Sequence, residues 1–258
     1  MILKRKIYKK LLEWKKECQG KKALLIEGAR RIGKSTICEE FGKSEYKSFL
    51  LIDFAKKDKE VEGYFEKYLN DLDTFFMLLQ THFGTKLTER NSLIIFDEVQ
   101  MFPQARAAIK YLVADGRYDY IETGSLISIR ENVKNIVIPS EERHINMYPL
   151  DFEEFAIALE EDLLVEYIKK CFEKREPLER SMHNQAMLLF HQYMLVGGMP
   201  MPVVTFIESK KDFTEADREK RDIIKLYRED IMKIDAKYRS KVLAIYDQIP
   251  GFLSQHEK

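Results

Sequence analysis

The sequence predicts an α/β fold, in which a mostly parallel, doubly wound sheet flanked by helices precedes a helical C-terminal region. Short apolar runs alternate with longer amphipathic stretches through residue 139, the order expected of parallel strands that are covered by helices on both faces. A loop bounded by two glycines joins the first apolar run to the stretch after it. With 258 residues, of which 45% are hydrophobic, the chain can bury the core that this fold requires.

The expected strands are short, apolar and followed by turn residues, which favours buried parallel strands. They lie at residues 23–27, 49–54, 92–98, 118–125 and 135–139. One helix is expected before the first strand, at residues 5–18, and others between the strands, from 34 to 41, at 56–79 and at 104–115. In the first helix Ile7, Leu11 and Trp14 recur at helical spacing, and Gly20 ends it. This basic amphipathic helix suits packing on the domain, and contact with a membrane surface is the alternative.

After Pro149 the pattern becomes helical, with the clearest segments at residues 149–172, 181–196, 223–234 and 239–253. Ser181 is expected to be an N-cap, and Gly197 to end the helix that follows it. Residues 208–222 are highly charged, which indicates a boundary. We therefore expect three parts: a core at 1–150, a lid-like helical subdomain at 151–206 and a helical linker from 207 to 258.

Charge balance, apolar runs and cysteine count indicate which partners the chain can bind and in which compartment it is expected. Lys plus Arg (43) balances Asp plus Glu (43), so net charge provides no general attraction for nucleic acid or anionic membranes. The sequence has no apolar run of 18 residues and no signal-peptide pattern, which predicts no membrane span. Three widely spaced cysteines form no disulfide framework and indicate reduced thiols, so a cytoplasmic location is expected.

Residues 28–35 read G-A-R-R-I-G-K-S and match the phosphate-binding pattern GxxxxGK[ST], the Walker A motif, at every fixed position. Glycines bring backbone N–H groups close to phosphate oxygens, and the helix that follows adds the positive end of its dipole. Lys34 can reach the β- and γ-phosphates, and the Ser35 hydroxyl can bind Mg²⁺. The alternative is an ordinary glycine turn with solvated cations. The motif predicts a P-loop NTPase with ATP and Mg²⁺ as cofactors, and the residues expected to bind the nucleotide are Gly28, Ala29, Arg30, Arg31, Ile32, Gly33, Lys34, Ser35 and Thr36.

The segment SLIIFDEVQ ends an expected strand with two acidic residues, in the pattern of a Walker B motif. Asp97 would hold Mg²⁺, directly or through water, and Glu98 would polarise the attacking water as a general base. A strand that ends in a solvated acidic turn is the alternative.

Three further residues are candidates for catalytic roles. Thr123 or Ser125, in the segment IETGS, could sense the γ-phosphate from a strand adjacent to the two strands already described. A plain threonine–glycine strand end is the alternative. Arg143 could approach the γ-phosphate in cis or from a neighbouring subunit, or pair with Glu141 or Glu142 on the surface.

These motifs favour an ATPase that binds and hydrolyses Mg-ATP, with Lys34 and Glu98 as central residues, and thereby drives or gates a conformational change. A nucleotide-dependent switch or scaffold with little turnover is the alternative. A small-molecule kinase is disfavoured, because no second basic cluster suitable for a lid is evident and the acidic pair suits water better than a phosphoryl acceptor.

With these residues in view, the chain resembles a large prokaryotic family of AAA-type P-loop ATPases that carry a C-terminal domain of unknown function. The resemblance covers nearly the whole chain. It is carried by the segments EGARRIGKST, LIIFDEVQMFPQARAAIKYLV, YIETGSLISI, INMYPLDFEEF and YMLVGGMP. It implies an AAA-type ATPase core at residues 1–150.

The segment YREDIMKIDAKYRSKVLAIYDQIPGFLSQ resembles the linker of this family and the start of its winged helix. The resemblance implies that residues 207–258 hold an incomplete winged helix and that the chain stops before the family's C-terminal domain. It also suggests DNA or a protein as a partner of this region. A second copy of the chain is a further candidate partner.

Overall fold

The chain folds into two compact units, Met1–Glu176 and Pro177–Lys258, which are described separately here. The computed structural model describes residues 1–125, 140–232 and 234–255. The three-part division expected from the sequence, with boundaries after residues 150 and 206, stays a prediction.

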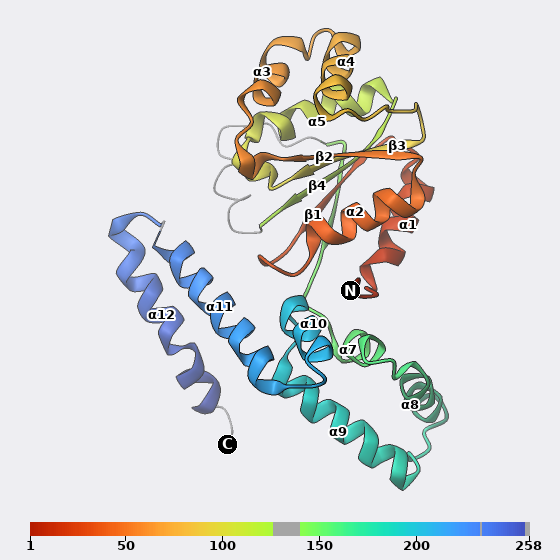
Figure 1. Ribbon diagram of the computed structural model, residues 1–258, viewed down its shortest axis with the longest axis vertical. Coiled ribbons are helices and arrows are strands. Elements are labelled where there is room, and N and C mark those ends of the chain that lie inside the picture. The colour runs from red at the N-terminus through yellow and green to blue at the C-terminus, as the bar shows by residue number, and fades with distance from the viewer. Residues whose placement is uncertain (126–139, 233, 256–258) are drawn as a thin grey trace. The chain divides into compact units, whose positions relative to one another are not determined.

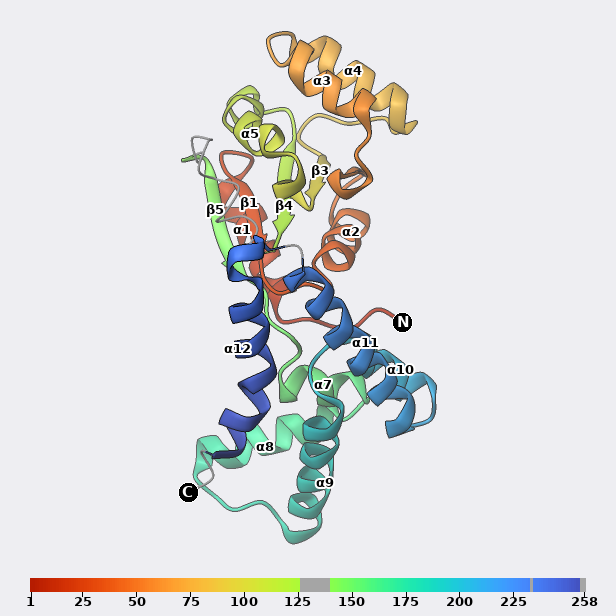
Figure 2. The same ribbon diagram turned by 90° about the vertical axis from the view of Figure 1, so that its left-hand side faces the viewer.

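The first unit contains a five-stranded sheet in which every described pairing is parallel. The strands are β1 (Ala23–Glu27), β2 (Ser48–Asp53), β3 (Ser92–Asp97), β4 (Asp119–Gly124) and β5 (Glu142–Asn146). Their order is β2-β3-β4-β1-β5, and Figure 2 shows β5 beside β1. Strand β4 therefore lies between β1 and β3, so the three strand ends that carry the predicted motifs are adjacent.

Helices cover both faces of the sheet, as Figure 1 shows. One face packs against α3 (Lys59–Tyr68), α4 (Leu72–Phe83) and α5 (Pro103–Asp115), and the other against α1 (Ile7–Cys18) and α2 (Lys34–Glu45). The predicted α/β class and doubly wound sheet are confirmed.

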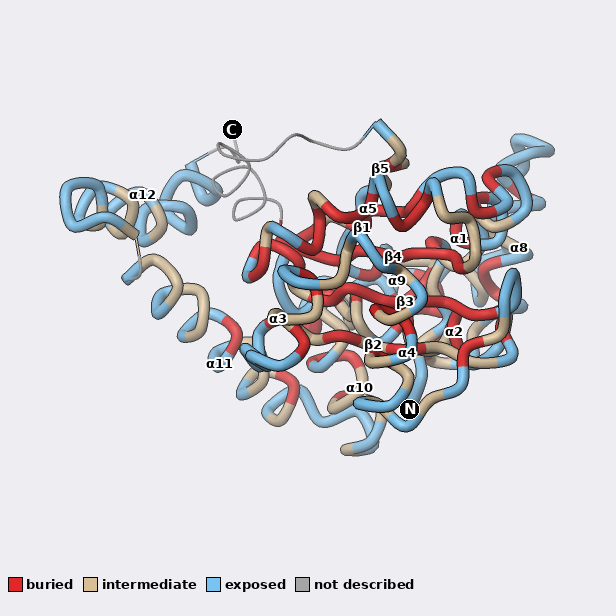
Figure 3. Tube along the Cα trace, turned by 90° about the horizontal axis from the view of Figure 1, so that it is seen from above, coloured by how far each residue is buried: buried red, intermediate tan, exposed pale blue. Residues whose placement is uncertain are grey.

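Alternation of side chains along each strand explains why both faces are apolar. Ile94 and Phe96 of β3 point into the cluster formed with α3, α4 and α5, whereas Ile95 between them points to the opposite face. On that opposite face the α1 residue Trp14 is buried against Phe41 of α2, with ring centroids 6.5 Å apart. The three central strands β1, β3 and β4 are buried on both sides, and they lie in the red, buried part of Figure 3.

The helical stretch expected at 56–79 is divided, so that prediction is wrong in its extent. A 3₁₀ turn, η1 (Phe54–Lys56), precedes α3, and α3 and α4 are separate helices. Asp71 begins α4 because its side chain accepts a hydrogen bond from the Thr74 backbone N–H at 3.2 Å, a typical N-cap arrangement.

The edge strand β5 was not expected from the sequence. The predicted strand at 135–139 falls outside the described residues, and the edge strand β5 begins at Glu142. Its sequence, ERHIN, is polar except for Ile145, and only Glu142 is buried. An edge strand of this composition lacks the apolar run by which the buried strands were recognised.

Unit 1 ends with α7 (Phe152–Ala158) and α8 (Asp162–Lys174). Unit 2 consists of α9 (Arg180–Val196), α10 (Pro200–Glu208), α11 (Phe213–Ile231) and α12 (Ala236–Gln255). Within this unit α10 and α11 pack together, whereas α12 has no buried residue (Figure 3).

One prediction about unit 2 is wrong. Glu179 is the N-cap of α9, because its side chain accepts from the backbone N–H groups of Ser181 and Met182, so Ser181 lies inside the helix. The charged segment 208–222 belongs largely to α11, which buries Ala216 on one side and leaves its charges at the surface. The predicted helix stop at Gly197 is confirmed, with φ at 81°.

Among the described residues, no single helix has both the length and the apolar character to cross a membrane. The pair α9 and α10 meets those criteria only jointly, across a 120° bend. Cys18, Cys38 and Cys171 are buried free thiols, as the sequence predicts.

Candidate functional site

The predicted phosphate loop connects β1 to α2. Its backbone takes left-handed conformations at Arg31, where φ is 63°, and at Gly33, where φ is 88°. Gly28 is required for a different reason. A Cβ atom there would lie 2.4 Å from the Met147 carbonyl oxygen and 2.6 Å from Ile32 Cδ1, so the loop packs too closely on the segment after β5 for any side chain.

Lys34 is the first residue of α2, and its side chain is buried. Its ammonium group donates to the carbonyl oxygens of Ala29 at 2.9 Å and Gly28 at 3.2 Å, which places the charge over the loop. Burial lowers the pKa of Lys34, and the carboxylates of Glu98 and Asp97 act in the opposite direction. A buried cation beside a turn of backbone N–H groups favours binding of a polyanion.

Asp97 lies at the end of β3 and receives hydrogen bonds from two directions. Ser35 Oγ donates to Asp97 Oδ1 at 2.8 Å, and the Thr123 hydroxyl donates to the same oxygen. Both Asp97 and Thr123 are buried. The structure therefore joins the ends of β3 and β4 to the first turn of α2 through a single carboxylate oxygen.

Glu98 follows β3 in a left-handed backbone conformation, with φ at 53°. Such a conformation is uncommon outside glycine, asparagine and aspartate and directs the chain sharply out of the sheet. The Glu98 backbone N–H donates to Thr123 Oγ1 at 3.3 Å, and the side-chain amide of Gln100 donates to Glu98 Oε2. Thr123 thus contacts both acidic residues, so in this structure it orients the pair.

The other predicted residues vary in their placement. Ile32 is buried, whereas the exposed residues of the loop and of the first turn of α2 are Ala29, Arg30, Arg31 and Thr36. Ser125 is buried directly after β4. Arg143 is not brought to this group: it lies on β5 opposite Leu24, three residues before the strand end, and forms an ion pair with Glu17 of α1 at 2.7 Å. This placement does not favour an approach to the γ-phosphate within one chain, and the predicted pairing with Glu141 or Glu142 is replaced by Glu17.

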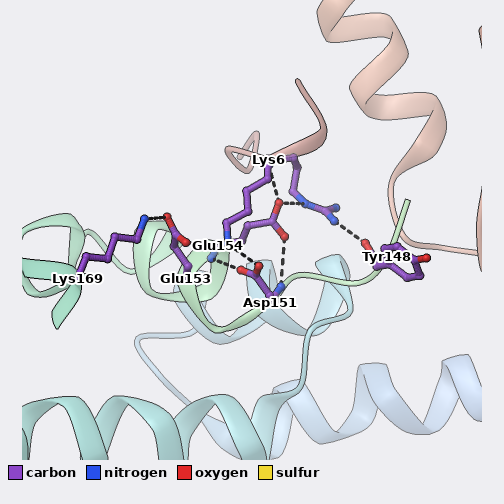
Figure 4. A network of polar contacts seen from close by, with 7 residues as sticks. Lys6, Tyr148, Asp151, Glu153, Glu154 and Lys169 are labelled. Carbon is purple, nitrogen blue, oxygen red and sulfur yellow. Dashed lines mark hydrogen bonds and ion pairs between the residues drawn. The ribbon is translucent and has the colours of Figure 1, made fainter. Parts of the chain in front are cut away.

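The structure adds residues that the sequence did not identify, and Figure 4 shows their polar network. Arg5 donates to the Ile32 carbonyl at 3.0 Å, to the Tyr148 carbonyl at 2.6 Å and to Glu154 Oε1 at 3.2 Å. Glu154 is buried, accepts the Lys6 backbone N–H at 2.6 Å and forms a capping box with Asp151 at the start of α7. The N-terminal segment and α7 are thereby fixed to the phosphate loop.

No sequence signal identifies the Arg5 contacts, because they join residues 27 to 149 positions apart. Gln100 is different. It stands two residues after Glu98, so its place in the sequence is a local signal for a contact with the acidic pair.

The residues at this site have the chemistry needed to bind a nucleotide together with Mg²⁺. Mg²⁺ is usually bound through one or two protein oxygens together with phosphate oxygens and water, and the adjacent Ser35 hydroxyl and Asp97 carboxylate supply such a pair. In the part of the chain that the structure describes, no three His, Cys, Asp or Glu side chains could hold a metal ion by themselves.

Comparison with known proteins identifies the family of the chain. The structure of PCH-2 from C. elegans is similar to this chain at 12% sequence identity and a TM-score of 0.41, over 84% of this chain and 65% of that one. No curated protein matches the chain. A family model described as an AAA domain matches residues 20–156, more than half of the chain. The chain therefore belongs to the AAA-type P-loop ATPase family.

Proposed function

We propose that this chain binds Mg-ATP and hydrolyses it, and that the cycle drives or gates a conformational change. The observation that carries the proposal is the convergence of the Ser35 and Thr123 hydroxyls on Asp97, beside the Lys34 ammonium and Glu98. A binding loop, a metal-binding pair and a candidate general base meet at one edge of a parallel sheet. Ligands of open α/β sheets bind at the carboxyl ends of the strands, which is the edge concerned here.

Each residue would have a defined role. Backbone N–H groups of residues 28–36 would surround the phosphates, and Lys34 would neutralise charge on the β- and γ-phosphates. Ser35 and Asp97 would hold Mg²⁺, which when bound neutralises charge on the phosphate oxygens. Glu98 would accept the proton of the attacking water. Thr123 would keep the acidic pair in place, and Ser125 at the end of the same strand stays a candidate γ-phosphate sensor.

The experiment compares Mg-ATP binding and phosphate release in the wild type, in Glu98→Gln and in Glu66→Gln. Glu66 is exposed on α3 and provides the same chemical change away from the site. A general base contributes about 10²–10⁴-fold to a rate, so Glu98→Gln should lose that factor while its Kd for nucleotide stays the same. Glu66→Gln should behave as the wild type.

A different result would contradict hydrolysis. If the wild type binds Mg-ATP but releases no phosphate, and Glu98→Gln behaves identically, the chain is a nucleotide-dependent switch or scaffold. Association with a second copy, binding of DNA or protein through residues 207–258, action of Arg143 from a neighbouring subunit and a cytoplasmic location stay predictions.

A further inference from the structure

Gln100 makes a contact with the candidate general base that the sequence analysis did not predict. Its side-chain amide donates to Glu98 Oε2. Gln100 lies in a 3₁₀ turn, η2 (Val99–Met101), immediately after Glu98, and only 8% of the residue is exposed. A polar side chain this deeply buried, with its amide on the carboxylate of the neighbouring motif, calls for an explanation.

The turn that carries Gln100 is held rigidly by the core. Val99, the first residue of the turn, and Phe102, which follows it, belong to the hydrophobic cluster formed with α3, α4 and α5. Phe102 stacks on Phe54 with ring centroids 5.3 Å apart. A backbone hydrogen bond also closes the turn, because the Met101 N–H donates to the Glu98 carbonyl oxygen at 2.9 Å. The Gln100 amide is therefore a fixed donor, in contrast to a mobile surface side chain.

Glu98, whose carboxylate receives this bond, directly follows Asp97, which is hydrogen-bonded to Ser35 in the first turn of the helix after the phosphate loop. The charge of Glu98 also raises the pKa of Lys34, against the effect of burial. The Glu98 backbone is held in the left-handed region and its N–H is bound to Thr123. The remaining freedom of Glu98 is rotation of its side chain, and the Gln100 amide restrains it.

We propose that Gln100 is a positioning residue for hydrolysis: its amide holds Oε2 of Glu98 and leaves Oε1 to accept the proton of the attacking water. The inference rests on the proposed ATPase function and adds a residue to it. In the step concerned, the water oxygen bonds to the γ-phosphorus and the bond from that phosphorus to the bridging oxygen breaks. The electron pair of the broken bond leaves with ADP, and the water proton goes to Glu98.

The test separates positioning from packing through matched substitutions. Gln100→Met keeps the length of the side chain and removes the donor. Gln100→Asn keeps the amide and shortens the side chain, and provides a second variant if the first fails to fold. Met101→Ala changes an exposed side chain in the same turn and is the control. Each is measured for nucleotide Kd and for the single-turnover rate of phosphate release.

We expect Gln100→Met to retain its Kd within twofold and to lose roughly 10- to 100-fold in the rate, the range that misplacement of a catalytic group by about 1 Å produces. Gln100→Asn should also slow the rate without weakening binding, and Met101→Ala should leave both unchanged. Because Gln100 acts through Glu98, Gln100→Met should change the residual rate less than twofold when Glu98 is already Gln.

The outcomes distinguish this inference from the function on which it rests. If the wild type releases no phosphate, the proposed ATPase function fails. If the wild type is active and Gln100→Met and Gln100→Asn release phosphate at its rate, the positioning role alone is overturned. The role is also overturned if Gln100→Met slows the residual rate of Glu98→Gln as much as it slows the wild type, since its effect would then not pass through Glu98.

Discussion

Ser35 Oγ donates a hydrogen bond to Asp97 Oδ1 at 2.8 Å, and this bond joins residues that lie 62 positions apart in the chain. Ser35 belongs to the first turn of α2, and Asp97 ends β3, with β4 between β3 and the strand that precedes the loop. The two motifs that the sequence shows separately therefore meet in space. The same pair would hold Mg²⁺ beside the phosphates.

The close approach at Gly28 gives the first prediction. Gly28→Ala places a methyl group 2.4 Å from the Met147 carbonyl oxygen, which is backbone and cannot move aside easily. The loop or the segment after β5 must shift, so we expect at least a tenfold loss of affinity for Mg-ATP, about 1.4 kcal/mol or more. Isothermal titration calorimetry measures it.

Gly63→Ala provides the matched control, because nothing lies within 4 Å of a Cβ at that position in α3. This variant should keep its affinity and gain about 0.5–1 kcal/mol of stability from the better helix propensity of alanine. Equal affinities for Gly28→Ala and Gly63→Ala would show that the loop does not need its tight packing.

The Arg5 network gives the second prediction (Figure 4). Arg5→Ala removes three hydrogen bonds and leaves the buried Glu154 without its guanidinium partner. Removing one member of a buried ion pair costs roughly 3–5 kcal/mol. At 2–4 °C per kcal/mol, the thermal midpoint of a chain of this size should fall by roughly 6–20 °C. Differential scanning fluorimetry measures the midpoint.

Lys6→Ala is the control for Arg5, because Lys6 also forms ion pairs with α7, with Asp151 and Glu153, but its side chain is about half exposed. Exposed pairs contribute about 0–1 kcal/mol, so its midpoint should change little. If the thermal midpoints of Arg5→Ala and Lys6→Ala fall by the same number of degrees, the buried hydrogen bonds of Arg5 do not hold the loop segment.

Sequence patterns predicted the central strands and the phosphate loop because their signals are local: apolar runs, a glycine spacing and an acidic strand end. The contacts of Arg5 were not predictable, since they depend on chain segments that only the fold brings together. Edge strand β5 was missed because its sequence is polar. The division between α3 and α4 had a signal in Asp71, which the periodicity of the flanking apolar residues obscured.

Long-range pairing also explains Arg143. Its sequence context, with acidic neighbours, suggested either a catalytic arginine or a local ion pair. The structure pairs it with Glu17, 126 positions away, because β5 lies beside β1 on the side that α1 covers. No local pattern contains that information.

Glu122 gives the third prediction, a dependence of stability on pH. It is fully buried on β4, and burial raises its pKa well above the usual value. The charge of Glu142 raises this pKa further, whereas the charge of Arg106 lowers it. The folded chain therefore retains a proton that the unfolded chain loses above about pH 4.5. Stability from this group consequently falls as pH rises from about 4.5 toward the folded pKa, by at most about 1.4 kcal/mol per pH unit.

In Glu122→Gln the side chain at position 122 is neutral at every pH, so this contribution to the change of stability with pH is absent. This variant should match the wild type near pH 4.5 and be more stable than the wild type at pH 8, as measured by urea unfolding at both values. Glu66→Gln, at an exposed position, should show no such difference. The difference in unfolding free energy between Glu122→Gln and the wild type could instead be the same at both pH values. That result would mean that Glu122 ionises normally in the folded chain.

The most direct test of the proposed nucleotide site is the thermal stability of the wild type, Lys34→Ala and Lys10→Ala with and without Mg-ATP. Lys10 is exposed on α1 and controls for the loss of a lysine. At about 100 times the Kd, nucleotide should add roughly 2.7 kcal/mol of stability to the wild type and to Lys10→Ala. Lys34→Ala should lose most of that gain. If Mg-ATP stabilises none of the three proteins, or all three equally, the loop from Gly28 to Ser35 is not the nucleotide site.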